Sequence, residues 1–230
     1  MFGLGDQEWA AVSLSLQVAF WAVLVSLPLA IWVAHLLSRG DFRGKQLLNA
    51  VVHLPLILPP VVTGYLLLLT FGTQGAVGAI LAQFGIVFAF RWTGAVLAAA
   101  VMAFPLIVRA IRLGIESVDP KLEEAAITLG ASRWRVFTTV TLPMCVPAIL
   151  AGTVLGFAKA MGEFGATITF VAAIPGETQT VPSAIYAFLQ VPGAEASAIR
   201  LTIIAIVIAV AALLLSELMA RRVTQRRVAP

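Results

Sequence analysis

Glu163 is the acidic residue whose surroundings in the sequence are hardest to reconcile with simple exposure to water. It follows an apolar run at about residues 144–161, and Lys159 precedes it by four residues, which places both side chains on one face of a helix. A carboxylate at bilayer depth costs roughly 2.5 to 3.5 kcal/mol, so it requires a partner or water. One interpretation is a solvated Lys159–Glu163 ion pair at the outer surface of a membrane.

A second interpretation makes the same segment a polar hinge beside a path through the membrane. Gly162 and Gly165 flank the acid and weaken a helix there, and Thr167 and Thr169 follow as hydroxyl donors. A carboxylate is a poor ligand for an anion, which hydroxyls, backbone N–H groups and basic side chains bind better. Glu163 is therefore predicted to be structural or part of a gate, with Thr167 and Thr169 as residues of the path or gate.

The chain offers no catalytic or metal-binding constellation of its own. The nearest approach to a phosphate-binding loop, residues 40–46, has three residues between its glycines instead of four and ends in Gln instead of Ser or Thr. His35 and His53 are single histidines without ligand spacing, and Ser183 has no base near it in the sequence. We therefore expect no catalytic residue, no metal ligand and no cofactor, and any energy from ATP must come from a partner.

The polar stretch from Asp119 to Pro143 separates strongly apolar runs and predicts two short helices. Asp119 is a suitable N-cap before Pro120, Gly130 suits a left-handed C-cap, and Ser132 can cap the next helix. Leu122, Ala125, Ala126 and Leu129 share one face of the first helix, and the two alanines let another backbone approach closely. We call residues 119–143 the docking stretch, which is either a docking element or an ordinary amphipathic loop helix.

Composition places the chain in a lipid bilayer. Of its 230 residues 60% are hydrophobic and only 11% are charged, whereas a soluble domain carries about 25% charged residues. The net charge of +4 comes from basic residues that flank apolar runs, which indicates membrane-flanking loops and excludes a nucleic-acid partner. The single cysteine, Cys145, allows no intrachain disulfide.

The apolar runs predict an all-α membrane protein with one transmembrane domain over residues 1–230. Five runs approach the roughly 20 residues that a spanning helix needs. They cover about residues 9–37, 47–71, 92–111, 144–161 and 198–220. A sixth span would require residues 77–90 or 166–173 to cross, and both are too short. A short helix is expected at about Pro182 to Gln190, in the long outer segment between the last two runs.

The basic residues predict the orientation of these spans. Twelve of the 15 Lys and Arg residues fall in the loop after the first run, in the region around the docking stretch, and after the last run. The opposite loops hold only Arg91, Lys159 and Arg200. The docking stretch and the C-terminus are therefore predicted to be cytoplasmic, with the N-terminus outside.

The docking stretch resembles the EAA signature of the membrane subunits of ABC importers. The matching positions are Glu124-Ala125-Ala126, Gly130 and Val140-x-Leu142-Pro143, with Val140 where that family usually has Ile. In that family the segment is a cytoplasmic coupling helix that fits a groove on the ATP-hydrolysing subunit. The resemblance implies a coupling role for Glu124, Ala125, Ala126 and Gly130, and a turn back into the membrane at Leu142 and Pro143.

Three further blocks, residues 53–68, 91–112 and 162–186, resemble the permease subunits of molybdate ABC importers. With the docking stretch, the resemblance extends from Trp9 to about Ala220. Sulfate and thiosulfate permeases share the GEFG sequence at residues 162–165, but they differ at residues 174–178, where this chain reads IPGET.

This resemblance implies the type I importer permease fold and an assembly in the cytoplasmic (inner) membrane of a prokaryote. The expected partners are a second copy of the chain, two ATP-binding subunits that hold ATP and Mg, and a periplasmic or extracellular oxyanion-binding protein. The expected function is import of molybdate, with tungstate as a related anion, by alternating access. The alternatives are a sulfate or thiosulfate permease and, outside the class, an ATP-independent anion channel or a membrane enzyme.

Overall fold

The apolar runs fold into helices, and no strand occurs among the residues that the computed structural model describes. The model describes the backbone of residues 4–228 and the side chains of residues 4–215 and 218. In chain order the helices are α1 (Asp6–Arg39), α2 (Lys45–Ile57), α3 (Pro60–Phe71), α4 (Gly78–Gln83), α5 (Trp92–Glu116), α6 (Pro120–Thr128), α7 (Arg133–Val136), a π-helical turn (Phe137–Thr141), α8 (Leu142–Met144), α9 (Val146–Met161), α10 (Gly165–Val171), α11 (Val181–Leu189) and α12 (Glu195–Val228).

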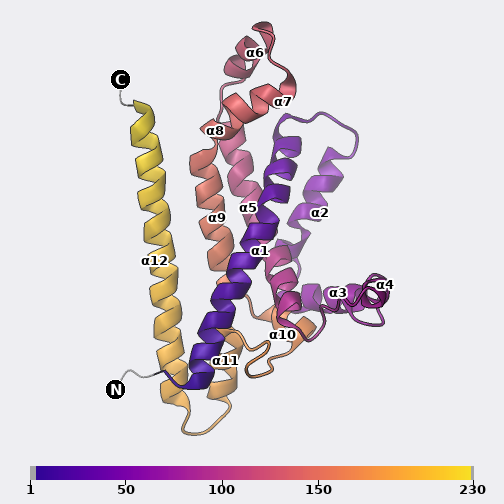
Figure 1. The fold of residues 1–230 in the computed structure, drawn as a ribbon, viewed down its shortest axis with the longest axis vertical. Helices are drawn as coiled ribbons and strands as arrows, with labels where there is room; N and C mark the ends of the chain where they lie inside the picture. Colours follow the sequence, from indigo (N-terminus) through magenta and orange to yellow (C-terminus); the bar gives the residue numbers. More distant parts are fainter. Residues whose placement is uncertain (1–3, 229–230) are drawn as a thin grey trace.

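The centre of the molecule is a tightly packed group of three long helices, α1, α5 and α9 (Figure 1). Small residues line the contacts, among them the fully buried Ala22 and Ala99. At Gly156 a Cβ atom would lie 2.6 Å from the side chain of Ile107, so only glycine permits this approach of α9 to α5. Close packing of small residues is a main source of helix association within membranes.

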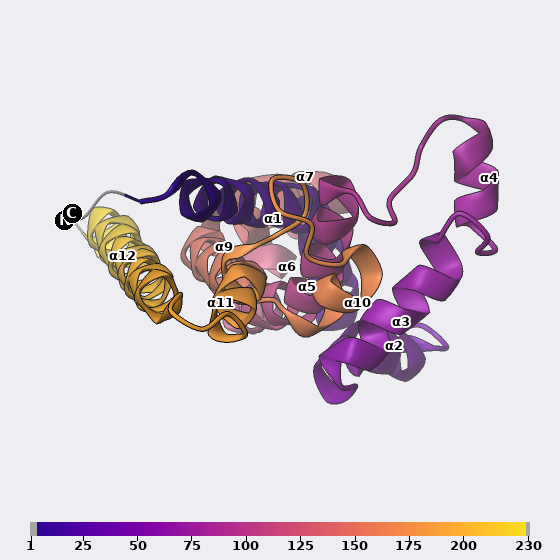
Figure 2. The same ribbon diagram turned by 90° about the horizontal axis from the view of Figure 1, so that it is seen from below.

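The remaining helices extend to two sides of this centre (Figure 2). On one side α10 packs against α3 and α5, and α3 continues into α4. On the other side α12 packs against α9 and α11. Helix α11 confirms the short helix predicted in the outer segment, and its buried Val181 and Ala184 pack against residues of α1 and α12.

Polar contacts fasten the start of α1 to this second side. Glu8, with its side chain 3% exposed, accepts hydrogen bonds at Oε1 from Arg200 Nε at 3.0 Å and Nη2 at 2.7 Å. The Val181 amide donates to Ser15 Oγ at 2.7 Å. The N-terminal part of α1, α11 and the start of α12 therefore form one unit at the end opposite α6 (Figure 1).

Three helices, α1, α5 and residues 195–215 of α12, are long and apolar enough to cross a membrane singly. Two bent pairs complete up to five spans: α2 with α3, and residues 133–144 with α9. This number agrees with the five predicted runs. The segments considered for a sixth span form only the six-residue α4 and the seven-residue α10.

The apolar run predicted over residues 47–71 is divided between two helices. Helices α2 and α3 meet at 115°, and the break falls at Leu58 and Pro59, whose ψ angles are 143° and 134°. Each of these residues precedes a proline, and the proline ring disfavours the helical conformation of the residue before it. The bend brings Gly64 of α3 so close to the Ala166 backbone that no side chain would fit between them.

Candidate functional site

Helix α6 has the cap structure that the sequence predicts. The Asp119 side chain accepts a hydrogen bond from the Lys121 amide at 3.0 Å, and Pro120 is the first helical residue. Gly130 follows with φ +89°, the left-handed conformation that favours glycine. Ser132 then caps α7 by accepting from the Arg135 amide at 3.4 Å. Short-range signals in the sequence are enough to define this helix and its two ends.

No residue of α6 is buried. Its large apolar side chains Leu122 and Ile127 are 46% and 49% exposed, and Leu129, directly after the helix, is 89% exposed. Glu124 and Ala125 are exposed and Ala126 is partly exposed. Figure 1 shows α6 at the tip of the molecule, beyond the ends of the long helices. This exposure leaves the helix accessible to another protein, and the coupling roles of Glu124, Ala125, Ala126 and Gly130 stay predictions.

One polar junction joins α6 to the long helices. Arg39, the last residue of α1, places its Nε 3.0 Å from Oε2 of Glu123, and Thr141 donates to Glu123 Oε1 at 2.7 Å. Arg39 Nη2 also donates to the carbonyl oxygens of Ile115 and Val118 at 3.1 and 2.9 Å. The Glu123 carboxylate thus connects α6 with α1, with the end of α5 and with the π-helical turn.

The chain returns towards the central helices through α7, the π-helical turn and α8. Leu142 and Pro143 are the first two residues of α8, and Pro147 lies in the first turn of α9. Residues 133–144 and α9 meet at 68°. Leu142 and Pro143 therefore lie just before the bend that leads back into the helical bundle, and their role in a turn into the membrane stays a prediction.

Glu163 lies in the break between α9 and α10 and is fully engaged. Its side chain is 1% exposed, and Oε2 pairs with Lys159 Nζ at 2.7 Å. Its other oxygen accepts a hydrogen bond from the Ala166 amide at 2.9 Å, at the start of α10. The interpretation as a water-exposed ion pair is therefore wrong for the Glu163 carboxylate, because packing around the break buries it. The arrangement agrees with a structural acid at a hinge between two helices.

Thr167 and Thr169 lie on α10, directly after this break. The Thr167 hydroxyl is buried and donates to the carbonyl oxygens of Phe164 at 2.9 Å and Glu163 at 3.3 Å. The Thr169 hydroxyl donates to the carbonyl oxygen of Gly165 at 2.9 Å. Both hydroxyl protons are committed to the backbone in this conformation, and the path or gate roles of Glu163, Thr167 and Thr169 stay predictions.

Sequence reasoning missed Glu123, although it is adjacent to the motif residue Glu124. Its partner Arg39 lies at the end of another helix, and nothing local links the two positions. The signal available was chemical: Arg39 ends an apolar run, and Glu123 begins a polar helix on the side that the basic residues define. Opposite charges at the same membrane face are candidates for such a pair.

Fold and site together define a multi-pass helical membrane protein with an exposed helix, α6, at one end. A solved bacterial alginate ABC transporter, in complex with an alginate pentasaccharide-bound periplasmic protein, contains a chain of this fold. The TM-score is 0.76 with 21% sequence identity, over 96% of this chain and 80% of that chain. The fold is that of a type I ABC importer permease.

The chain belongs to the family of binding-protein-dependent transport system inner membrane components, which matches residues 26–225. It is 62% identical, over 95% of its length and 96% of the relative's, to the molybdenum transport system permease protein ModB of Escherichia coli K12. It is 38% identical to the sulfate transport system permease protein CysT of the same strain, over 80% of this chain and 66% of that protein.

Proposed function

We propose that this chain is the permease subunit of an ATP-driven importer that moves molybdate, with tungstate as a related anion, across the inner membrane. The observation that carries the proposal is the 62% identity, over nearly the whole chain, to a molybdenum permease. The sulfate permease is more distant, at 38% identity over a shorter part of the chain. The molybdate assignment is therefore favoured over the sulfate and thiosulfate alternative.

The proposed assembly holds two copies of this chain, two cytoplasmic ATP-binding subunits and one extracytoplasmic oxyanion-binding protein. The exposed helix α6 supports a cytoplasmic partner, because its apolar side chains have no cover within the described part of the chain. ATP and Mg belong to the ATP-binding subunits, so hydrolysis takes place outside this chain. The chain transmits motion, and it neither makes nor breaks a covalent bond.

In this proposal the cytoplasm lies at the end of the molecule that carries α6. The C-terminal end of α12 lies towards the same end and the start of α1 at the opposite end (Figure 1). With α6 in the cytoplasm, the C-terminus is cytoplasmic and the N-terminus is outside. The excess of basic residues in the loops at the α6 end supports the same orientation.

The attachment of α6 to the long helices supports a mechanism of alternating access. When ATP binding draws the two ATPase subunits together, each α6 moves with its subunit. The Arg39–Glu123–Thr141 junction passes this movement to α1, α5 and the bend before α9. Two packed helices that move as rigid bodies can open one side of a path while they close the other. The break at Glu163 lies at the far end of α9 and is the proposed gate element.

The test is uptake of labelled molybdate into proteoliposomes that contain the permease, its ATPase subunit and its binding protein. Uptake that requires ATP and survives excess sulfate is the expected result. Uptake that sulfate abolishes would assign the chain to sulfate instead, with the same mechanism. Uptake without ATP would contradict the importer assignment and favour a channel.

Two variants test the coupling role of α6 within this assay. Ala125→Trp and Gly130→Pro are expected to abolish binding of the ATPase subunit and ATP-driven uptake, while the chain remains inserted in the membrane. Normal ATPase binding and normal transport by either variant would show that α6 is not the coupling helix.

A further inference from the structure

Two adjoining cavities lie where the end of α1 faces α6 and α7. The first, of about 430 Å³ and called the polar cavity, is lined by charged and polar side chains, among them Arg39, Glu123 and Thr141, together with apolar ones. The second, of about 390 Å³, is lined by apolar side chains that include Pro28, Ile31, Trp32 and Leu142. Both cavities are lined by His35, Arg133 and Phe137, so a polar space continues into an apolar one.

The polar cavity keeps one unneutralised positive charge. The Glu123 carboxylate is already engaged by Arg39 and Thr141. Arg133 is exposed and forms no ion pair with any side chain in the described part of the chain. His35 adds a buried Nδ1 atom for which the described residues provide no hydrogen-bond partner. The chemistry of this half suits a phosphate group.

The apolar cavity lies along α1 between Trp32 and Pro28. At 1.5 Å per residue along α1, Trp32 is about 10 Å and Pro28 about 16 Å from Arg39. Trp32 and Trp134 are 58% and 72% exposed, and tryptophan concentrates at membrane surfaces. On the same face of α1 the exposed Val25 and Leu29 continue the apolar surface.

We infer that these paired cavities bind one anionic phospholipid of the cytoplasmic leaflet. Its phosphate lies at Arg133 beside His35, and one acyl chain follows Trp32 towards Pro28. Basic pockets between helices on the cytoplasmic side are typical sites for anionic lipid headgroups. A free phosphate would leave the apolar half unfilled, so the membrane is the source of the ligand.

Such a lipid would stabilise the position of α6 and α7 relative to the end of α1. Arg133 begins α7, and Glu123 lies on α6 against the same cavity. A phosphate held between the end of α1 and the start of α7 therefore stabilises one position of α6 relative to the bundle. This function is independent of the anion that the importer carries.

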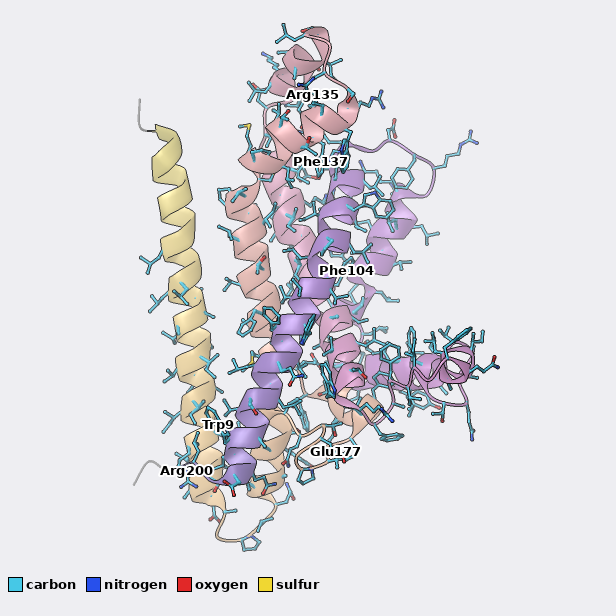
Figure 3. All side chains as sticks on the ribbon, in the orientation of Figure 1. Trp9, Phe104, Arg135, Phe137, Glu177 and Arg200 are labelled. Atoms are coloured by element: carbon cyan, nitrogen blue, oxygen red, sulfur yellow. The ribbon has the colours of Figure 1, made fainter. Side chains whose placement is uncertain are left out.

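The test is native mass spectrometry of the purified full chain with dioleoyl phosphatidylglycerol as the probe. Arg133→Gln is expected to weaken retention of one lipid about fivefold, since a basic residue near an anionic membrane contributes on the order of that factor. Arg135→Gln is the matched control, because Arg135 lies two residues away at the same end of the molecule and lines neither cavity (Figure 3). Equal retention by both variants would overturn the inference.

Four further experiments separate the alternatives. Trp32→Ala is expected to lower retention several-fold while Trp21→Ala, on the same helix but away from the cavities, leaves it unchanged. Equal retention of dioleoyl phosphatidylcholine would overturn the anionic requirement. Displacement of the lipid by millimolar glycerol phosphate would show that the polar half binds a free anion, and displacement by the ATPase subunit would show that the cavities belong to a protein interface. Either displacement would overturn the proposal.

Discussion

Charged residues interrupt the apolar chain at α6 and at the break between α9 and α10. The side chains of α6 stay at least partly exposed, whereas the Glu163 side chain at the break is buried. Helix α6 buries none of its residues, and Leu129 after it is 89% exposed. Glu163 at the break is 1% exposed, and both of its oxygens have partners within six residues of sequence. The chain itself leaves the first region uncovered, whereas it satisfies the polar groups of the second.

This difference separates the roles of the two acids Glu124 and Glu163. A surface for a partner can lose a side chain with little effect on the stability of the permease. A buried ion pair that also caps a helix cannot, because removal of one partner leaves the other without compensation. Substitutions in the two regions should therefore change different measured quantities.

Glu163→Ala should have the largest effect on stability, about 3 kcal/mol of the free energy of unfolding. The substitution leaves Lys159 without its partner and removes the acceptor of the Ala166 amide. Thermal unfolding of the full chain in detergent measures the loss, with the exposed Glu177→Gln as the control. Glu163→Gln should lower the free energy of unfolding less, since its amide oxygen can still accept a hydrogen bond from the Ala166 amide. A Glu163→Ala chain as stable as wild type would mean that the ion pair contributes nothing.

Arg39→Gln should have an intermediate effect, about 2 kcal/mol, because it removes the Glu123 ion pair and two hydrogen bonds to the end of α5. It should also loosen α6, so that trypsin cleaves after Lys121 faster. The control is Arg43→Gln, an exposed arginine in the adjoining loop. If both variants are cleaved at the same rate, the junction does not hold α6 in place.

Gly130→Ala should have the smallest effect, about 1 kcal/mol, because alanine is strained at φ +89° although no atom obstructs its side chain. The strain is local to the C-terminal end of α6, where the amides of Gly130 and Ala131 donate to Ile127 and Ala126. Hydrogen exchange at residues 130 and 131 should become about fivefold faster. Gly193→Ala, which has the same φ angle in the outer loop, should leave that exchange rate unchanged.

A structural feature could be predicted from the sequence wherever the residues that determine it lie within a few positions of one another. The caps at Asp119 and Gly130, the Lys159–Glu163 pair and the number of long apolar runs all follow from local spacing. Helix propensity and capping act within one or two turns, so they can be read from neighbouring residues.

Three features depend on contacts between distant parts of the chain and could not be predicted in this way. The ion pairs Arg39–Glu123 and Glu8–Arg200 join residues that come together only after the long helices have packed. The 115° bend between α2 and α3 has a local cause in Pro59 and Pro60, but its fit against Ala166 depends on where α10 lies. Local spacing therefore predicted helix α6 and its caps, but not the attachment of α6 to the long helices.

The measurement that tests the central claim most directly is the affinity of the ATPase subunit for Leu129→Glu permease in nanodiscs. Burial of a leucine side chain contributes about 1.5 to 3 kcal/mol, so the affinity should fall about ten- to a hundredfold. The unfolding temperature should not change, because Leu129 is already exposed in the permease. Leu189→Glu, an exposed position on α11 at the opposite end, should bind normally. Equal affinity of the Leu129→Glu and wild-type chains would contradict docking at α6.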